Sequence, residues 1–445
     1  MVLALASAVL IPADRPGLGW AIAGVALLAL VRKGFGVLWP ALAFGLLFMS
    51  VFRSAGWVFA LCVAAVLILT AVAVVDGRTW RELGLALPRW VWGAMRVVPS
   101  VTAASDRHGA VRLARGIGAG LALVVLFGLL LGSAEREFAD LLRPLLSWTR
   151  LATFGCVALL CLGALHLRGV HPSSREVNRK EWSRLEWAIP VALVDLLFAT
   201  FAVVQFTVLF GGHEHVLDPH GPTYAQYARG GFLELATVAL LTLAVVAAVL
   251  SRVAPADRAL ARVLVGLLCG LTLVIVGSAL RRMQLYVEAF GFTRTRLLAT
   301  AVIVWLGLIF LLVLLAWGRA ILPRLTLATG AAVLLGLVIL NPDRLVAQTV
   351  IGRWEKDGHL DAPYLASLSP DALPALKALP DPKRSCIAGV IVRNHLRDRD
   401  AWNEWNHARA GGRKVVLKGE DCAFYMTSGY RMEGNWTDPS EVTSR

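Results

Sequence analysis

Charged residues are scarce in this chain of 445 residues. They make up 17% of it, whereas 57% of the residues are apolar. Water-soluble domains contain about a quarter charged residues, and they do not carry long apolar stretches one after another. The shortage of charge therefore excludes an ordinary soluble protein and predicts a chain that crosses a membrane several times.

Several sequence motifs of enzymes and nucleic-acid-binding proteins are also missing. The chain has no HExxH, no GxSxG, no Asp-Asp pair and no CxxC. Without these motifs, the sequence indicates no activated nucleophile and no spacing of metal ligands. We therefore expect neither a metal nor a cofactor, and we favour a protein that is not an enzyme. Basic tracts and aromatic-basic interleaving are missing too, which argues against nucleic acid as a partner.

Ten apolar runs are long enough, or nearly so, to cross a hydrocarbon core of about 30 Å as helices. Backbone groups in lipid are satisfied only in helices or closed barrels, and continuous runs of this length predict helices. Residues 1–11 are apolar but short and lack a basic n-region, so we expect part of a first helix that starts upstream rather than a signal peptide. The predicted fold is an all-α polytopic bundle of 10–11 transmembrane helices over residues 1–340, with runs at 17–31, 35–50, 57–75, 114–132, 150–167, 186–210, 231–250, 259–280, 297–317 and 322–340.

The distribution of arginine and lysine predicts the orientation of the bundle. One side, which we call side A, carries 19 basic residues in its connectors, whereas the opposite side, side B, carries 10. Because basic residues concentrate in cytoplasmic loops, side A is expected to be cytoplasmic and the tail at 341–445 extracytoplasmic. The location predicted is a plasma membrane. Segment 76–113, with Trp80, Trp90 and Trp92 among arginines, is predicted to lie in the cytoplasmic interface and contact membrane lipids.

The tail is predicted to be small and mostly helical. Asn341 and Ser369 each precede Pro and Asp, which is the pattern of a helix N-cap with proline at the first helical position. We also expect a helix containing HLRDRDAWNEWNHARA and short strands in KVVLKGEDCAFYM. Trp402 and Trp405 share one face of this helix and are expected to pack inward, either on the membrane domain, which we favour, or in a small core of the tail. Cys386 and Cys422 are the two cysteines of the tail, and an oxidising compartment would allow a disulfide between them.

Polar residues at membrane depth are the strongest functional signal, because they are costly there. Asp195 lies near the middle of the run 186–210, with Gln205 about three turns further on. Two explanations stay open: a proton or cation site, or a buried hydrogen bond between helices.

Two polar connectors on side B are candidates for a ligand site. The first, residues 210–235, contains five residues of types that bind metals, His213, Glu214, His215, Asp218 and His220. Their irregular spacing favours a solvated loop over a metal site. The second, residues 278–296, places four arginines where the orientation predicts few. Either the orientation is wrong, or partners such as Glu234 and Glu288 hold these arginines, or they bind an anionic group. The candidate ligand-binding residues are Tyr224, Tyr227, Arg229, Glu234, Arg281, Arg282, Tyr286 and Glu288.

These polar stretches resemble a family of bacterial multi-pass membrane proteins known as domain of unknown function 4173. The resemblance rests on FGLLLGSAEREF (127–138), VQFTVLFGG (204–212), TYAQYARGGFLEL (223–235), SALRRMQLYVEAFGFTRTR (278–296) and the stretch from NPDRLVAQ to SPDALPAL (341–376). It implies a multi-helix membrane domain with an appended tail. The family tends to have other residues at Glu135, Gln226 and Phe290, and it supplies no catalytic residue.

Three functions are compatible with the sequence. The first, which we favour, is binding or transport of an anionic or amphiphilic small molecule at the side B cluster, with Asp195 as the coupling acid. The second is a regulatory or scaffold protein whose tail binds a protein partner. The third is a membrane-embedded enzyme that acts on a lipid or envelope precursor.

Overall fold

The structure is a computed structural model that describes residues 11, 15–31, 38–75, 80–90, 92, 182–210, 232–317, 321–358 and 360–415. These residues form α-helices and short 3₁₀ helices, and no strand occurs among them. The chain divides into two compact units. The first unit comprises residues 1–174 and 398–411, and the second comprises residues 175–397 and 412–445.

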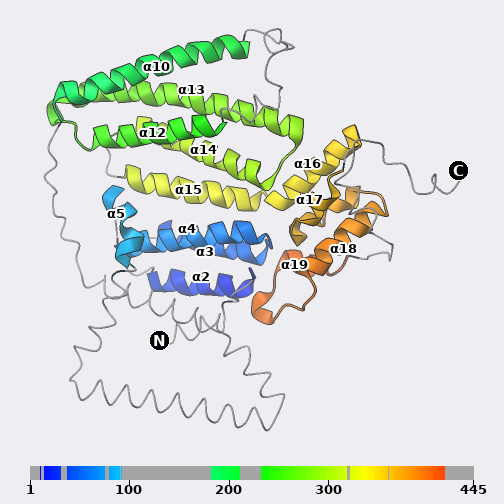
Figure 1. The fold of residues 1–445 in the computed structure, drawn as a ribbon. Coiled ribbons are helices and arrows are strands. Elements are labelled where there is room, and N and C mark those ends of the chain that lie inside the picture. Colours follow the sequence, from blue (N-terminus) through cyan, green and yellow to red (C-terminus); the bar gives the residue numbers. More distant parts are fainter. Residues whose placement is uncertain are drawn as a thin grey trace, which may run out of the picture. The chain divides into compact units, whose positions relative to one another are not determined.

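Three apolar helices lie side by side in the first unit (Figure 1). They are α2 (Leu18–Val31), α3 (Leu38–Phe48, continued by the 3₁₀ helix η1 at Met49–Val51) and α4 (Gly56–Val75). Helix α3 packs against both α2 and α4. An edge-to-face contact between Trp20 and Phe59, with ring centroids 5.0 Å apart, also joins α2 to α4.

Helix α13 is the centre of the membrane helices of the second unit (Figure 1). It packs against α10, α12 and α14, and α14 packs in turn against α15. Their buried faces share one apolar core, which includes Trp187, Leu268 and Phe310. The bounds are α10 (Arg184–Phe210), α12 (Phe232–Leu250), η3 (Pro255–Asp257), α13 (Arg258–Phe290), α14 (Arg294–Leu315) and α15 (Leu322–Ile339).

The predicted class, an all-α polytopic helix bundle, is confirmed. Five of the described helices are long and apolar enough to cross a membrane, namely Gly56–Val74, Arg184–Val203, Pro255–Glu288, Arg294–Leu315 and Leu322–Ile339. Two shorter apolar helices, Leu38–Val51 and Ala236–Leu250, match further predicted runs. The predicted spans at 114–132 and 150–167 lie outside the described residues, so the total of 10–11 helices stays a prediction.

Helix α13 continues beyond the predicted span of 259–280, where a connector was expected. It runs on for ten residues to Phe290 and ends at Gly291, whose φ of 75° lies in the region that favours glycine. The apolar run ends at the first arginine, but a helix ends only where a residue stops it. Its 33 residues correspond to about 50 Å, which is longer than a hydrocarbon core of about 30 Å.

Only part of the predicted interfacial segment 76–113 is described. It contains the short helix α5 (Trp80–Gly84) and a helical stretch at 86–90. Trp90 is buried and Trp92 is exposed. The expected position of this segment at the membrane surface stays a prediction.

The tail begins with the helix starts expected from its sequence. The Asn341 side chain accepts a hydrogen bond from the Arg344 N–H (3.3 Å) and caps α16. Ser369 precedes a 3₁₀ helix as expected, but its hydroxyl donates to Asp371 (3.0 Å) instead of capping. The elements are α16 (Pro342–Asp357), α17 (Ala362–Ala366), η4 (Pro370–Ala372), η5 (Ala375–Ala378), α18 (Lys383–His395), η6 (Trp402–Glu404) and α19 (His407–Gly412).

The single helix expected over HLRDRDAWNEWNHARA does not form. Helix α18 ends at His395, and α19 starts anew after Asn406, whose side-chain oxygen accepts the Arg409 N–H (3.2 Å). A side chain that caps a new helix competes with continuation of the old one. Trp402 and Trp405 are exposed, by 60% and 43%, which contradicts their expected inward packing. The strands expected in KVVLKGEDCAFYM fall almost entirely outside the described residues.

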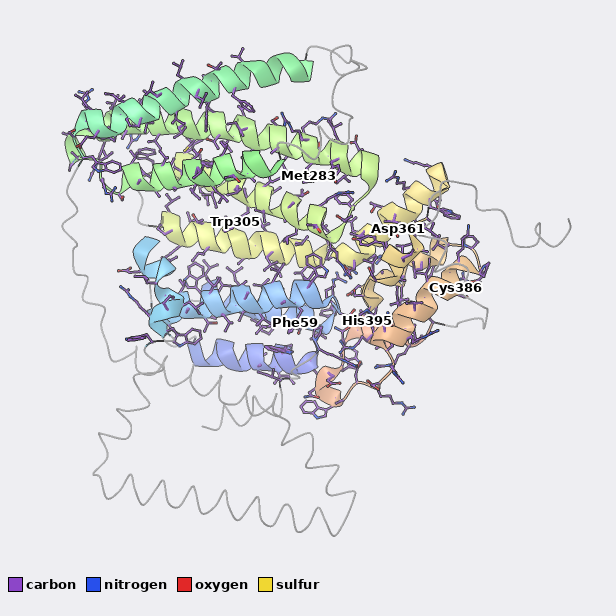
Figure 2. All side chains as sticks on the ribbon, in the orientation of Figure 1. Phe59, Met283, Trp305, Asp361, Cys386 and His395 are labelled. Carbon is purple, nitrogen blue, oxygen red and sulfur yellow. The ribbon has the colours of Figure 1, made fainter. Side chains whose placement is uncertain are left out.

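Close packing between α14 and α15 depends on Gly330. Trp305, labelled in Figure 2, donates its indole N–H to the Thr326 carbonyl of α15 (3.1 Å), and a Cβ at Gly330 would lie 2.9 Å from its ring. We expect Gly330→Ala to lower the midpoint of thermal unfolding in detergent, at a cost of about 1–3 kcal/mol from overpacking. Gly336 of α15 has open space around it, so Gly336→Ala is the matched control and should not lower the midpoint. Equal midpoints for the two variants would contradict the packing described.

Candidate functional site

Asp195 lies in the middle of the buried face of α10. The buried residues of this helix recur every three or four positions, which places them on one face. They are Trp187, Val191, Asp195, Phe198 and Ala202, and Asp195 is only 4% exposed. The opposite face is apolar and exposed at Leu185, Ile189, Leu193, Leu196, Leu197 and Val203, as expected of a face turned to lipid. The acid therefore points into the bundle.

The Asp195 carboxyl group has no hydrogen-bond partner among the described residues. Both of its oxygens are buried and unpaired. It lies close enough to Cys269 of α13 to act electrostatically on that thiol. The buried hydroxyls of the neighbouring helices are directed elsewhere, because Thr242 donates to Val238 (2.8 Å) and Thr272 donates to Leu268 (2.6 Å). A hydrogen bond between helices, one of the two explanations considered from the sequence, is therefore not formed by the residues described.

A second unpaired polar group lies on the same face of α10. The indole N–H of Trp187 is buried without a hydrogen-bond partner in the described part of the chain. Trp187 and Asp195 are eight residues apart, or about 12 Å along the helix. Buried polar groups are nearly always hydrogen-bonded, so each exception needs an explanation. The buried apolar face of α10 therefore contains one donor, the Trp187 indole N–H, and one acceptor group, the Asp195 carboxyl.

Much of the predicted side B cluster cannot be placed. Tyr224, Tyr227 and Arg229 lie outside the described residues, as does the His-Glu-His stretch at 213–215. Glu234 belongs to α12, but its side chain is not described. In the ranges that are described, no group of three or more His, Cys, Asp or Glu is arranged to hold a metal ion.

The rest of the cluster lies on the last turns of α13. Arg281 and Glu288 are exposed, and Arg282 and Tyr286 are half-buried one turn apart. Arg296 of α14 lies over the Tyr286 ring, with its guanidinium carbon 4.1 Å from the ring centroid, and donates to the Gly291 carbonyl. The cluster is therefore built on two helix ends rather than on a connector.

Arg294 has an acidic partner that differs from those considered in the sequence. Its guanidinium forms a two-pronged ion pair with Asp343 of α16, at 2.9 Å (Nε–Oδ1) and 2.7 Å (NH2–Oδ2). The Ser369 N–H donates to the same carboxylate (2.9 Å), and the Tyr364 hydroxyl accepts the Arg294 backbone N–H (3.0 Å). The start of α14 is thereby fixed to the tail, and Phe292 packs on the tail core.

The sequence signal for this ion pair is Asp343 in the Asn-Pro-Asp stretch. Helix capping accounts for Asn341 only, whereas the Asp343 side chain is fully buried against Arg294. The turn at 291–293 and the start of the tail lie at the same end of α14 and α15.

Cys386 is buried and disulfide-bonded. Its partner is not among the described residues, because the other two described cysteines, Cys62 and Cys269, are free. The pairing with Cys422 stays a prediction.

Apolar helices of spanning length pack around Asp195, a buried acid that no described residue hydrogen-bonds. They define a class of protein: a polytopic α-helical membrane protein with an ionisable group inside its bundle. Residues 38–379 match the family described as "Domain of unknown function (DUF4153)", and the chain belongs to that family. The resemblance to an uncharacterised membrane family is thus supported, but family 4153, and not 4173, is the one that matches. No curated protein and no solved structure matches the chain.

Proposed function

We propose that this protein binds or transports an anionic, amphiphilic small molecule and that protonation of Asp195 is coupled to this activity. The observation that carries the proposal is the buried Asp195 carboxyl group, which has neither oxygen hydrogen-bonded to a described residue. An ionised carboxylate without a partner is very unfavourable in an apolar interior, so the group is neutral in this conformation. Its ionisation requires a second conformation that supplies water, a cation or a donor.

The proposed site has two parts, Asp195 and the arginines at the end of α13, and α13 connects them. Cys269 of this helix is within electrostatic range of Asp195, and Arg281 and Arg282 follow three to four turns later, about 18–20 Å along the axis. A guanidinium group binds carboxylates, phosphates and sulfates well. A shift of α13 when an anion binds its end changes the surroundings of Asp195, and this provides the coupling.

The protonation state of Asp195 can be measured without knowing the ligand. Infrared spectra of the protein in nanodiscs, recorded with and without ¹³C-labelled aspartate, should contain a carboxylic acid band at neutral pH that disappears in Asp195→Asn. Asp257→Asn is the matched control, because Asp257 directly precedes α13 and pairs with Arg184 (3.9 Å), with side chains that are 20% and 65% exposed. A band that is missing from the wild type, or that persists in Asp195→Asn, would contradict a neutral acid at this position.

Transport is tested with decyl sulfate, an anionic amphiphile that stays ionised and carries no protons itself. In proteoliposomes containing a pH-sensitive dye, the wild type and Asp257→Asn should show proton flux that depends on decyl sulfate. Asp195→Asn should reduce this flux at least tenfold while decyl sulfate still binds, because one essential carboxyl group is lost and the arginines remain. Flux that is equal in wild type and Asp195→Asn would refute the coupling role.

The location and orientation belong to the same proposal. We place the chain in a bacterial inner membrane within the cell envelope, with the tail from 341 onward outside the cytoplasm. The support is the excess of basic residues on side A. Labelling of thiols in intact cells, with and without reductant, tests the side of the tail and the Cys386–Cys422 pairing together.

A further inference from the structure

The tail segment 398–411 has an inverted distribution of side chains. Its polar residues Asn403, Asn406 and Arg409 are at most 5% exposed, whereas Trp402 and Trp405 are 60% and 43% exposed. A segment surrounded by water normally buries its tryptophans and exposes its charges. Exposed tryptophans in a rigid segment therefore indicate a partner surface.

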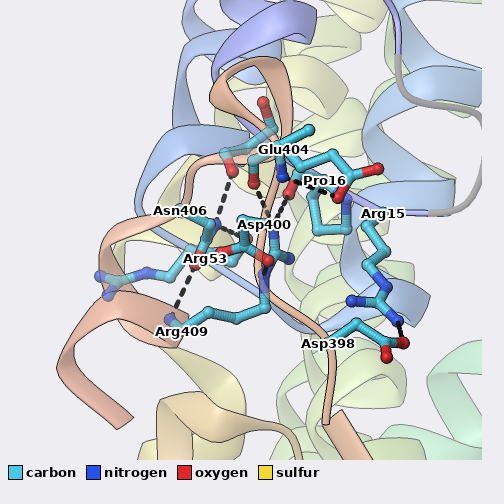
Figure 3. A network of polar contacts seen from close by, with 10 residues as sticks. Arg15, Pro16, Arg53, Asp398, Asp400, Glu404, Asn406 and Arg409 are labelled. Atoms are coloured by element: carbon cyan, nitrogen blue, oxygen red, sulfur yellow. Dashed lines mark hydrogen bonds and ion pairs between the residues drawn. The ribbon is translucent and has the colours of Figure 1, made fainter. Parts of the chain in front are cut away.

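Hydrogen bonds place this segment where membrane helices begin. The Trp405 carbonyl accepts the N–H of Leu18, the first residue of α2 (3.0 Å). The Asn406 side-chain amide donates to the carbonyls of Ser50 (2.7 Å) and Arg53 (2.9 Å). Arg53 lies three residues before the first residue of α4 (Figure 3). Helix α4 is long and apolar enough to span the bilayer from Gly56, and a spanning α4 would place the segment at the depth of the lipid headgroups.

The segment is held firmly in this position. The guanidinium of Arg409 pairs with Asp400 (3.0 Å) and donates to the carbonyl of Pro16 (2.9 Å), as Figure 3 shows. Close approach also requires glycine at position 17, because a Cβ there would lie 2.6 Å from the carbonyl carbon of Glu404. The tryptophans are thus presented by a fixed scaffold, which reduces the entropy lost on binding.

We propose that Trp402 and Trp405 insert into the headgroup region of the membrane that α4 crosses, and that segment 398–411 anchors the tail to the lipid surface. Indole suits this depth because its ring is apolar and its N–H can donate to lipid carbonyl or phosphate oxygens. Phe52, 37% exposed, extends the apolar surface next to His407, with ring centroids 6.2 Å apart. Arg399 is exposed three residues before Trp402 and supplies a positive charge for phosphate.

The experiment measures quenching of tryptophan fluorescence by brominated lipids. Full-length protein is placed in nanodiscs whose phosphatidylcholine carries bromine either near the carbonyl groups or near the chain ends. The fluorescence of Trp402 and Trp405 is obtained by subtracting the fluorescence of the double variant W402F/W405F from that of the wild type. We expect bromine near the carbonyls to quench this difference signal more strongly than bromine near the chain ends.

Trp354→Phe is the matched control in the tail. Trp354 belongs to α16, where the Lys383 ammonium lies 4.9 Å from its ring centroid, and its difference signal should not depend on brominated lipid. Exposed tryptophans tolerate replacement by phenylalanine well, and the single variants W402F and W405F give the same readout separately. A Trp402 and Trp405 signal that aqueous iodide quenches, but neither brominated lipid does, would refute insertion and leave the surface available to a protein partner.

Discussion

Arg294→Ala is expected to lower the free energy of unfolding of the second unit by about 3–5 kcal/mol, because it leaves a buried carboxylate without its counter-charge. The Asp343 side chain is 0% exposed, whereas Arg294 is 31% exposed. Without Arg294, the Ser369 N–H still donates to the Asp343 carboxylate. A neutral donor cannot replace the positive charge that balances a buried carboxylate.

The difference in burial between the partners predicts unequal effects of removing each one. Asp343→Asn keeps an oxygen that can accept from Ser369, and it leaves Arg294 near enough to solvent to be hydrated. We therefore expect Asp343→Asn to cost about 1–3 kcal/mol, less than Arg294→Ala. Arg294→Lys should also be destabilising, because an ammonium group cannot form the two-pronged contact.

The measurement is unfolding in detergent, followed by the fluorescence and helicity of each variant. Arg344→Ala is the matched control for Arg294→Ala, since Arg344 is exposed on the same helix as Asp343 and should change stability by less than about 0.5 kcal/mol. Equal effects of Arg294→Ala and Arg344→Ala would mean that the buried ion pair does not hold the tail to α14.

The same pair predicts a dependence on pH. Burial alone would raise the pKa of Asp343, but the hydrogen bonds and charge of Arg294, together with the Ser369 N–H, outweigh burial and hold the pKa below its usual value. A carboxyl group with a lowered folded-state pKa contributes stability that is complete above its usual pKa of about 3.9 and is lost as the pH falls further. The stability difference between wild type and Asp343→Asn should therefore stay constant at neutral pH and shrink below about pH 4.

The helices could be predicted from the sequence because each depends on its own residues. The apolar runs at 57–75, 297–317 and 322–340 agree within a few residues with α4, α14 and α15. The prediction failed at α13, because hydropathy reports where lipid ends and not where a helix ends. It failed again at 395–410, because the stop in the helix depends on Asn406, whose side chain also contacts Ser50, a residue 356 positions away.

The candidate site, too, could be predicted from the sequence only in part. An acid inside an apolar helix stands out in any sequence, so Asp195 could be identified, and its direction follows from the spacing of its buried neighbours. The pairing of Arg294 with Asp343 could not be foreseen, since either residue has several possible partners until the fold brings two together. The sequence pattern predicts which polar residues are energetically costly to bury. The tertiary contacts determine which partner offsets that cost for each of them.

Asp400→Asn is expected to cost about 3 kcal/mol and to release segment 398–411 from the first unit, because it removes the carboxylate that forms the buried ion pair with Arg409. Both side chains of this pair are 3% exposed. Burial lowers the pKa of Arg409, and the Asp400 charge opposes that change, which shows how much the guanidinium depends on its partner. The carbonyls of Pro16 and Glu404 still accept from Arg409, but neither carries a full negative charge.

The control lies two residues earlier in the same segment. Asp398 pairs with Arg15 at 3.4 Å, and these side chains are 72% and 34% exposed, so Asp398→Asn should cost less than about 1 kcal/mol. Hydrogen–deuterium exchange of the amides from 398 to 411 is the measurement, because it detects local release even when the helices stay folded. Faster exchange is expected in Asp400→Asn only. Similar exchange in the two variants would show that the segment is held by the Trp405 backbone contact to α2 and the Asn406 side-chain contact to η1, with the buried charge pair contributing little.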